Sequence, residues 1–293
     1  MTITALDFDA VREAFQRAAP HYDRHAVLQQ EVEQRLLQRL DYFPLEPMVV
    51  LDLGCGTGVA SHALAQRYPA AQVIGLDWAP AMLAQSLHRP ASGALPGMVC
   101  ADMRQLPIAS GSVDLVFSNL AVQWVTDLGN LFAGVRRVLR PGGVLLFSSF
   151  GPDTLYELRE AWSQVDELPH VNRYMDMHHV GDGLVSAGFR DPVMDTQRIV
   201  LQYREVRDLM RDLKGIGAHN AALQRAAGLT GKGVLARVLG AYEDFRRDGY
   251  YPATYEVIIG AARGPAEGQP VRQGEEEIAT FSVDALRGSR RGR

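Results

Sequence analysis

Cysteine is scarce in this sequence, and several features that mark specialised classes of protein are absent. The two cysteines, Cys55 and Cys100, are too few for a disulfide framework, so we expect a reducing cytoplasm as the location. No apolar run is long enough for a membrane-spanning helix, and the segment MTITALDFDA lacks the basic and apolar parts of a secretory signal. A net charge of -4 provides no overall attraction to nucleic acid or to an anionic membrane, so we expect neither partner. We find no internal repeat.

The composition is that of an ordinary globular protein. Of the 293 residues, 47% are hydrophobic, which is enough for a sizeable core. We expect a single domain over residues 1–263, made of an N-terminal helical lid (1–44), a core (45–150) and a half with final strands and inserted helices (151–263). The tail, 264–293, is rich in Gly, Pro, Glu and Arg and is predicted to be partly disordered.

The N-terminal segment predicts two helices that are separated by a proline. Val32, Leu36 and Leu40 recur at helical spacing, which favours a long helix in the second part of the segment. Pro20 cannot continue a helix from the preceding residues, so a bend is expected near Pro20-His21-Tyr22.

Strands and helices alternate through the middle of the chain. Apolar runs predict strands in MVVLDL, AQVIGLD, GMVCAD, VDLVFSN and VLLFSSF, with a turn at RPGG before the last of them. Such strands are typical of a parallel sheet that is covered on both faces. Two more strands are predicted in PVMDTQRIVLQY and ATYEVIIGAAR, and residues 204–250 are predicted to be mostly helical with a break at GLTGKG. The expected fold is α/β, with inserted helices that roof the carboxyl edge of the sheet.

The glycine-rich loop after the first strand is the main candidate for a ligand site. It reads Asp52-Leu53-Gly54-Cys55-Gly56-Thr57-Gly58, and ligands of open parallel sheets bind at the carboxyl ends of the strands. The spacing G-x-G-x-G differs from the G-x-G-x-x-G of dinucleotide-binding proteins. An acid beside the loop would repel a pyrophosphate and attract a cationic amino group. A dehydrogenase therefore fits less well, and Cys55 is interpreted as a small loop residue rather than a nucleophile.

The acidic residues that end the next strands suit a nucleoside. Asp77 is placed to accept hydrogen bonds from both ribose hydroxyls. At the third strand end, Asp102 could accept from an adenine amino group while Met103 covers the ring, and Asn119 ends the fourth strand. The combination predicts a site for a nucleoside that carries a positive amino acid and no phosphate.

At this point the chain resembles the class I S-adenosylmethionine (SAM) methyltransferases. The matching blocks are VLDLGCGTG, GLDWAPAML, CADMRQLP, SNLAVQW and LRPGGVLLF, within residues 48–147. The resemblance implies a Rossmann-like fold with a seven-stranded, mostly parallel sheet, and S-adenosylhomocysteine as the product. The cofactor-binding residues are then expected to be Asp52, Gly54, Cys55, Gly56, Thr57, Gly58, Asp77, Trp78, Asp102, Met103 and Asn119. A SAM-binding protein without catalysis remains an alternative, because a fold does not determine an activity.

A narrower resemblance covers residues outside this core. FQRAAPHYDRHAVLQ, HVNRYMDMHH, LKGIGAHN and YYPATYEVIIG are similar to the malonyl-acyl-carrier-protein O-methyltransferases of biotin synthesis, from about Phe8 to Arg263. The resemblance implies methylation of the free carboxylate of a malonyl thioester, which starts pimeloyl assembly. The acceptor is expected to be malonyl-acyl-carrier protein or malonyl-coenzyme A. Another small-molecule methyltransferase, acting on a carboxylate or a quinone precursor, is the alternative within the same fold.

The implied reaction suggests which residues hold the acceptor. A carboxylate with a pKa of about 4 is already ionised and needs no general base, so we expect positioning to dominate. Arg173 is the best cation for the acceptor, because guanidinium binds a carboxylate through two hydrogen bonds. The alternative is an Arg173–Asp176 pair at the surface. Tyr22, Gln123 and Trp124 are expected to lie near the transferred methyl group, although Tyr22 and Trp124 could also be core residues.

The segment from Arg204 to Arg247 is expected to dock an acidic carrier protein. It contains nine Lys or Arg against five Asp or Glu, a local net charge of +4 in an acidic chain. Arg204, Arg207, Arg211 and Lys214 are spaced so that a helix would place them on one face. An ordinary solvated face is the alternative. The sequence does not indicate an oligomeric state.

The stretch HVNRYMDMHHVG, residues 170–181, is rich in histidine but does not predict a metal site. Its histidines and Asp176 lack a regular ligand spacing, and the implied chemistry requires no Lewis acid. We expect no metal, with His170 and Asn172 steadying Arg173 at the substrate and with His178 and His179 at the start of a helix.

Overall fold

Helices cover the N-terminal part of the protein. The computed structural model describes residues 6–90, 93–218, 231–266, 271–273 and 276–278. The first elements are α1 (Phe8–Ala18), the 3-10 turn η1 (Ala19–His21), α2 (Tyr22–His25), α3 (Val27–Arg39) and the 3-10 turn η2 (Leu40–Tyr42). The carboxylate of Asp7 caps α1 by accepting from the backbone N of Ala10 at 3.1 Å. The predicted break at Pro20 is confirmed.

The centre of the protein is a seven-stranded sheet. In spatial order the strands are β3 (Gly97–Cys100), β2 (Gln72–Asp77), β1 (Val49–Leu53), β4 (Val113–Ser118), β5 (Leu139–Phe150), β7 (Tyr251–Arg263) and β6 (Arg190–Tyr203). Every neighbouring pair is parallel except the two that β7 makes, which are antiparallel. The predicted α/β fold is thus confirmed. The turn predicted at RPGG is wrong as a strand boundary, because β5 begins at Leu139 and its pairing with β4 shifts register there.

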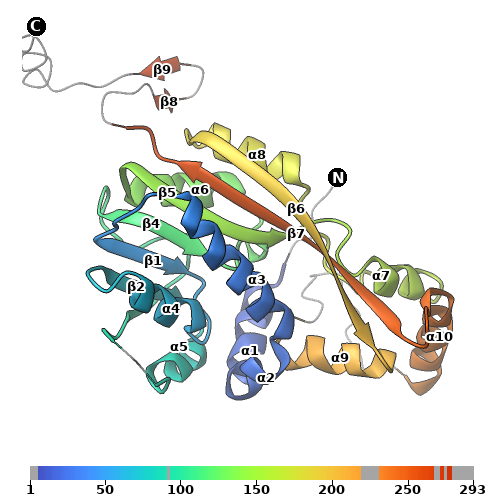
Figure 1. The fold of residues 1–293 in the computed structure, drawn as a ribbon. Coiled ribbons are helices and arrows are strands. Elements are labelled where there is room, and N and C mark those ends of the chain that lie inside the picture. The colour runs from blue at the N-terminus through green and yellow to red at the C-terminus, as the bar shows by residue number, and fades with distance from the viewer. Residues whose placement is uncertain (1–5, 91–92, 219–230, 267–270, 274–275, 279–293) are drawn as a thin grey trace, which may run out of the picture.

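Helices lie on both faces of the sheet (Figure 1). Helices α3 and α4 (Val59–Arg67) contribute to one hydrophobic core, which contains Leu36 and Leu64, each with 0% of its surface exposed. Helices α6 (Leu128–Val138) and α8 (Met177–Ser186) contribute to a second core with Phe132 and Leu184. Helix α5 (Pro80–Leu87) packs beside β2 and β3.

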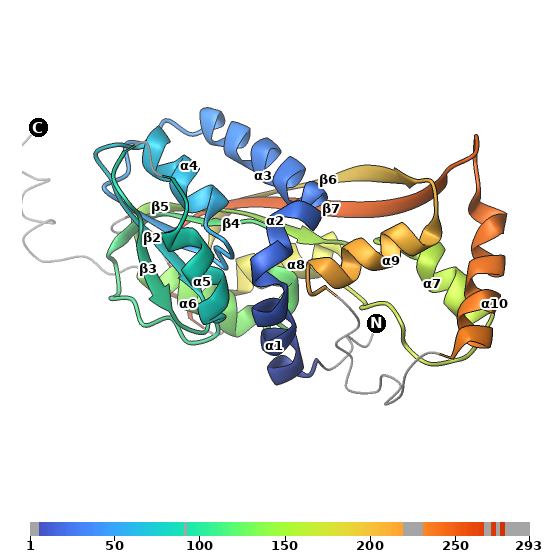
Figure 2. The same cartoon turned by 90° about the horizontal axis from the view of Figure 1, so that it is seen from below.

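Strands β6 and β7 continue past the end of the sheet. The pairing of β5 with β7 stops at Phe150 and Val257, whereas β6 and β7 remain paired as far as Tyr203 and Tyr251. This two-stranded ribbon carries α7 (Tyr156–Ser163), α9 (Val206–Gly215) and α10 (Lys232–Tyr242), as Figures 1 and 2 show. The 3-10 turn η4 (Glu243–Phe245) follows α10. The predicted helical cap is this ribbon with its helices. Part of the predicted GLTGKG break lies in 219–230, outside the described residues.

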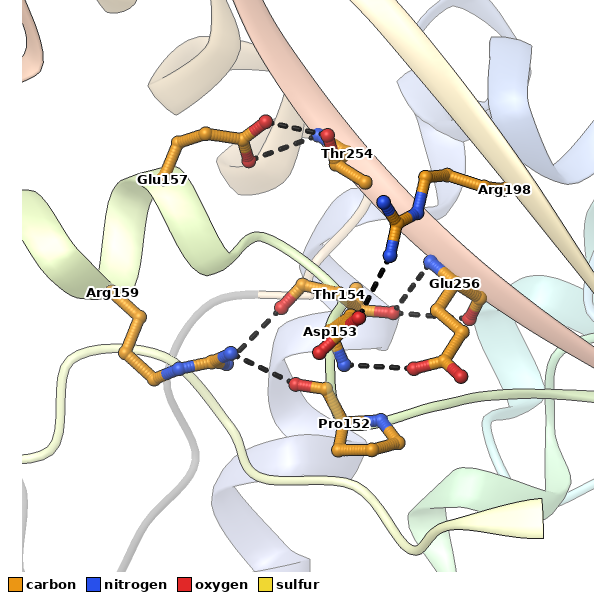
Figure 3. A network of polar contacts seen from close by, with 8 residues as sticks. All are labelled: Pro152, Asp153, Thr154, Glu157, Arg159, Arg198, Thr254 and Glu256. Atoms are coloured by element: carbon orange, nitrogen blue, oxygen red, sulfur yellow. Dashed lines mark hydrogen bonds and ion pairs between the residues drawn. The ribbon is translucent and has the colours of Figure 1, made fainter. Parts of the chain in front are cut away.

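A polar network fastens α7 to the ribbon (Figure 3). Both carboxylate oxygens of Glu157, a fully buried residue, accept hydrogen bonds from Thr254, at 2.5 Å from its hydroxyl and 3.1 Å from its backbone N. Glu256 of β7 accepts from the backbone N of Asp153, which lies on the loop before α7. Arg159 of α7 donates to the carbonyl oxygens of Pro152 and Thr154 on the same loop. The network satisfies polar groups that would be costly to bury alone and thereby orients α7.

Two short strands lie in the described part of the tail. Strands β8 (Val271–Gln273) and β9 (Glu276–Ile278) form an antiparallel pair. Residues 267–270, 274–275 and 279–293 lie outside the described part of the chain, and partial disorder of the tail stays a prediction. None of the helices in the described residues has the length and apolar composition that crossing a membrane requires.

Candidate active site

The glycine-rich loop is drawn against the end of β2. The backbone N atoms of Gly54 and Cys55 donate to the carbonyl oxygen of Leu76 at 2.8 and 3.0 Å. Gly56 donates its backbone N–H to the carboxylate of Asp77 at 3.0 Å. Gly54 has a φ of +74°, and a methyl group there would overlap the side chain of Ala121. The loop therefore depends on glycine both for its conformation and for the space beside it.

The main pocket opens at this loop, along the carboxyl ends of β1, β2 and β4. Most of the predicted cofactor residues line it, namely Gly54, Gly56, Asp77, Trp78, Asp102, Met103 and Asn119. It is also lined by Tyr22, Gln123 and Trp124, the three residues predicted to lie near the methyl group. Residues far apart in the sequence are thus brought together where the parallel strands end.

Asp77 both holds the glycine loop and lines the main pocket. One oxygen accepts from Gly56, and the other accepts from the backbone N of Ala79 at 2.8 Å. Burial raises the pKa of Asp77 to about 6. A carboxylate that already holds the loop on one side and lines the pocket is suited to hydroxyl donors from a ribose.

A second, smaller concavity lies on the other side of the glycine loop, under α3. We call it the acidic hollow; it is lined by Asp52, Glu33, Cys55 and Thr57, and it shares Tyr22, Gln29, Gly54, Gly56 and Asn119 with the main pocket. Gly58 lines neither concavity and precedes α4 instead, with a φ of +78°. The shared residues make the two concavities adjoining parts of one site.

The acidic hollow contains two carboxyl groups that resist ionisation. Asp52 is 1% exposed and accepts a hydrogen bond from Ser61 at 2.5 Å. Burial raises the pKa of Asp52 to about 7, and burial with the neighbouring charge of Asp52 raises the pKa of Glu33 to about 8. A cation in this hollow would favour the ionised forms of both. Sequence reasoning missed Glu33, although it lies four residues after Gln29 and on the same side of α3.

Asp102 has a partner that the sequence did not reveal. Its carboxylate accepts two hydrogen bonds from Nε of Arg104, at 2.9 and 3.0 Å, and one from Nη2 at 2.5 Å. Burial acts to raise the pKa of Asp102, but the hydrogen bonds from Arg104 outweigh it and the pKa is lowered. Arg104 also lies over the ring of Phe8, at 4.0 Å from the ring centroid. The acid is therefore held ionised at the pocket wall beside Met103.

Two buried amide oxygens around the main pocket lack a hydrogen-bond partner within the described part of the chain. They are Oε1 of Gln29 and Oε1 of Gln123. The side-chain N of Asn119 donates to the backbone carbonyl oxygen of Gln29, and its Oδ1 accepts from the hydroxyl of Ser148 at 2.8 Å. Unpartnered buried acceptors are rare, and a polar ligand in the pocket would satisfy them.

Aromatic residues of the N-terminal helices close the main pocket. Phe15 of α1 packs edge-on against Trp124 with ring centroids 5.3 Å apart, and it also contacts Tyr22. Burial raises the pKa of the Tyr22 hydroxyl well above its usual value, so Tyr22 is a neutral hydrogen-bond donor. Phe15 and Tyr22 thus bring the N-terminal helices to the pocket wall, and a lid formed by residues 1–44 stays a prediction.

Arg173 does not line the main pocket. It is exposed and borders a small hollow, which we call the Arg173 hollow, together with Asn172, Ser149 and Tyr174. This hollow shares Gln123, Trp124 and Val125 with the main pocket. The alternative pairing with Asp176 is wrong, because Asp176 instead caps α8 and accepts from the backbone N and Nδ1 of His179. Arg173 has no hydrogen-bond or ion-pair partner among the described residues.

The remaining substrate candidates lie around a larger cleft beneath the cap. We call it the cap cleft; it runs between α1, α7 and α9 and is lined in part by His170, Asn172, Arg211 and Lys214. His170 does not steady Arg173, as was expected, because its ring stacks on Trp162 at 3.6 Å and its Nε2 hydrogen-bonds Asp166. Arg207 is exposed on α9 but does not border the cleft, and Arg204 precedes the helix, so the predicted four-residue stripe is wrong.

The histidine-rich stretch is divided between different environments. His170 and His179 each pair with a nearby aspartate, and α8 begins at Met177, so that His178 and His179 lie in its first turn as predicted. In the described ranges, no group of three or more His, Cys, Asp or Glu side chains is arranged to hold a metal ion.

Comparison with known proteins identifies the class to which this fold and pocket belong. Residues 51–147 match the family model described as a methyltransferase domain. The structure is similar to a protein from Bacillus halodurans (TM-score 0.56, 16% identity, 80% of this chain and 99% of that one). It is also similar to phosphoethanolamine N-methyltransferase 2 of Haemonchus contortus (TM-score 0.52, 21% identity, 79% of this chain and 52% of that one). The fold is that of a class I SAM-dependent methyltransferase, which excludes the dehydrogenase alternative.

More similar relatives specify the family. The chain is 52% identical to a malonyl-[acyl-carrier protein] O-methyltransferase from Gallionella capsiferriformans, over 89% of this chain and 92% of the relative. It is 46% identical to the protein of that name from Xylella fastidiosa, over 94% of each chain. The chain belongs to the malonyl-[acyl-carrier protein] O-methyltransferase family, so the narrower resemblance is confirmed.

Proposed function

We propose that this enzyme transfers the methyl group of SAM to the free carboxylate of malonyl-acyl-carrier protein. The product is a methyl ester, which masks the charge and lets chain extension toward a pimeloyl group begin for biotin synthesis. The observation that carries the proposal is the identity of 52% over 92% of a relative with this activity in its name, because that match includes the acceptor half of the chain. Location in the cytoplasm stays a prediction.

The two adjoining concavities suit the two ends of the cofactor. When bound, SAM supplies a methyl group on a sulfonium centre. Its cationic amino group would lie in the acidic hollow with Asp52 and Glu33, and Asp77 would accept from the ribose. Met103 and Trp78 would cover the adenine in the main pocket. The unpartnered oxygens of Gln29 and Gln123, and the space that glycine leaves at position 54, support this fit.

The residues of the site position the acceptor rather than deprotonate it. A malonyl carboxylate, with a pKa of about 4, is ionised at neutral pH. The pocket must hold one oxygen in line with the methyl carbon at roughly 3 Å and keep water away. Tyr22 can donate a hydrogen bond to that carboxylate, while Phe15 and Trp124 form an apolar wall beside it.

Arg173 is the proposed cation for the acceptor carboxylate. It has no acidic partner among the described residues, and it borders a hollow that shares Gln123 and Trp124 with the main pocket. The pKa of Arg159 is lowered, first by the burial of Arg159 itself and second by the positive charge of Arg173. The second cause means that the two guanidinium groups lie near each other. Two neighbouring cations attract an anion between them.

The decisive experiment supplies SAM and malonyl-carrier protein and measures the mass of the carrier. A gain of one methyl group is expected on malonyl-carrier protein, with none on acetyl-carrier protein, which has no free carboxylate. Malonyl-coenzyme A, tested in parallel, measures the preference for the carrier. Methylation of a free acid or a quinone precursor, with malonyl-carrier protein unchanged, would establish the small-molecule alternative. Tight SAM binding without turnover of any acceptor would indicate a non-catalytic protein.

A further inference from the structure

The cap cleft has a distinct distribution of charge. Its described lining includes Arg17 of α1 and, on α9, Arg211 and Lys214, together with the histidines His21 and His25, and it includes no Asp or Glu. The nearby acids lie outside this lining and pair with three of its members: Glu13 with Arg17, Asp208 with Arg211, and Asp212 with His25. An anion that enters the cleft therefore meets the side chain of Lys214, unpaired among the described residues, and two guanidinium groups, with no carboxylate in the described lining itself.

The cations lie on two facing helices that are held close together. Nδ1 of His25 contacts Asp212 at 2.8 Å and joins α2 to α9. Gly217 comes after α9 in the chain, has a φ of +71° and packs against α1. A Cβ atom at this position would lie 3.0 Å from the carbonyl oxygen of Ala14. Arg17 and Lys214 are exposed, and the side chain of Lys214 has no hydrogen-bond or ion-pair partner among the described residues. Figure 2 shows α1 and α9 on the same side of the molecule, with the sheet behind them.

The inner part of the cleft is apolar and leads toward the main pocket. Leu155, Leu158 and Val171 line it and are buried, and Trp162 stacks on His170 at its side. Ala218 lines both the cleft and the main pocket. Tyr174 of the cleft packs against Phe150 of the main pocket, with ring centroids 5.4 Å apart. A narrow, mostly apolar chain could thus pass from the exposed cations to the methyl-transfer site.

We propose that the cap cleft receives the phosphopantetheine arm of the carrier protein, with Arg17 and Lys214 binding its phosphate at the mouth. This inference rests on the proposed function and assigns a path to its substrate. The arm is a slender amide chain with a monoanionic phosphodiester at one end and the thioester at the other, which matches a cleft with cations outside and apolar walls inside. The acidic surface of the carrier would then lie against α9, where Arg211 and Arg207 are exposed.

The test compares one acceptor that has the arm with one that lacks its phosphate. Arg17→Glu and Lys214→Glu are assayed with malonyl-carrier protein and with the malonyl thioester of N-acetylcysteamine. Each variant is expected to raise KM for the carrier substrate about tenfold, while KM for the short thioester changes less than about twofold. The matched control is Lys232→Glu, which makes the same charge change at an exposed cap residue outside the cleft and is expected to leave both KM values unchanged.

A binding measurement gives a second readout that does not depend on turnover. Wild-type protein should bind holo-carrier protein, which carries the arm, about tenfold more tightly than apo-carrier protein, and Lys214→Glu should remove this preference. Equal binding of holo and apo forms by the wild type overturns the inference, as does a change in KM that is the same for both thioesters or for Lys232→Glu. A holo preference that Lys214→Glu removes, in a protein that methylates neither thioester, would refute the proposed function while leaving the arm in the cleft.

Discussion

Two parts of this protein are built on different principles: the cofactor half, residues 45–150, and the acceptor half, residues 151–263. In the first half, most of the proposed binding residues lie at or just after the ends of strands of a buried parallel sheet, and neighbouring strand ends bring Asp52, Asp77 and Asn119 together. In the second half, the cap is supported by a two-stranded ribbon that has left the sheet, and its clefts are formed by helices from three separate segments. A local sequence motif therefore predicts a site only where motifs that follow one another in the sequence also lie side by side in the fold.

The strongest test of this contrast changes the glycine loop alone. Gly54→Ala adds a methyl group that overlaps Ala121, and SAM affinity is expected to fall by about 100-fold, because pocket space and backbone conformation are both lost. Isothermal titration with SAM measures the effect. Gly142→Ala is the matched control, since Gly142 also has a positive φ, +75°, but has open space around it. An equal loss of affinity in both variants would contradict the role of the pocket.

A substitution of Arg173 tests acceptor binding separately from cofactor binding. Arg173→Ala is expected to lower kcat/KM for malonyl-carrier protein about 100-fold, because the carboxylate loses its cation, while SAM affinity changes little. Steady-state kinetics and SAM titration are measured on the same preparations, with Arg173→Lys expected to restore part of the activity. Loss of SAM binding in Arg173→Ala would instead place this residue in the support of the fold.

The attachment of α7 to the ribbon can be weakened by substituting a residue that lines none of the pockets described above. Thr254→Val removes the hydroxyl that binds buried Glu157, and the free energy of unfolding is expected to fall by about 2 kcal/mol because a carboxyl oxygen is left unsatisfied. Denaturant unfolding measures this, and Thr196→Val, on the partner strand, is expected to cost less than about 0.5 kcal/mol. A neutral result for Thr254→Val would mean that the network of Figure 3 does not hold the cap in place.

The smallest expected effect is a dependence of SAM affinity on pH. The pKa values of Asp77, Asp52 and Glu33 are raised to about 6, 7 and 8, so the empty site carries protons near neutral pH. A cationic amino group favours the ionised acids, so SAM affinity should rise several-fold between pH 5.5 and about 7.5, where the amino group is still protonated. Glu33→Gln should reduce this slope. An affinity that falls as pH rises would mean that the amino group does not enter the acidic hollow.

The same raised pKa values determine how the stability of the empty protein changes with pH. Each acid binds a proton more tightly when folded than when unfolded, so its contribution to stability is complete below the unfolded pKa and is lost as pH rises through 6 to 8. Saturating SAM should reduce this loss.

The sequence predicts the cofactor half well because its signals are local. Strand, loop and acid follow one another within a few residues in GLDWAP and in DLGCGTG, and the structure places Asp77 and Asp52 at strand ends as expected. It could not reveal that Arg104 pairs with Asp102, since that contact depends on how the chain turns after β3. Nor could it reveal that Glu33 comes to lie over Asp52, because this depends on how α3 packs across the sheet.

The acceptor half was predicted less well because its contacts join distant residues. His170 was expected beside Arg173, three residues away, yet it stacks on Trp162 and leaves Arg173 exposed. Arg211 and Lys214 meet Arg17 across a cleft, although almost 200 residues separate the two helices in the chain. Spacing within one segment contains no information about such pairs.

The length of the β6–β7 ribbon has a consequence for which acceptors the enzyme can use. Each residue pair added to the ribbon lengthens it by about 3.3 Å. The length of the ribbon therefore determines the distance between the sheet, where the methyl donor is proposed to bind, and α9 at the far end of the ribbon. Adding or deleting two pairs would keep the same side chains facing inward while moving α9 along the axis of the ribbon. Enzymes on this plan could therefore measure the reach of their acceptors without altering the machinery that holds the donor.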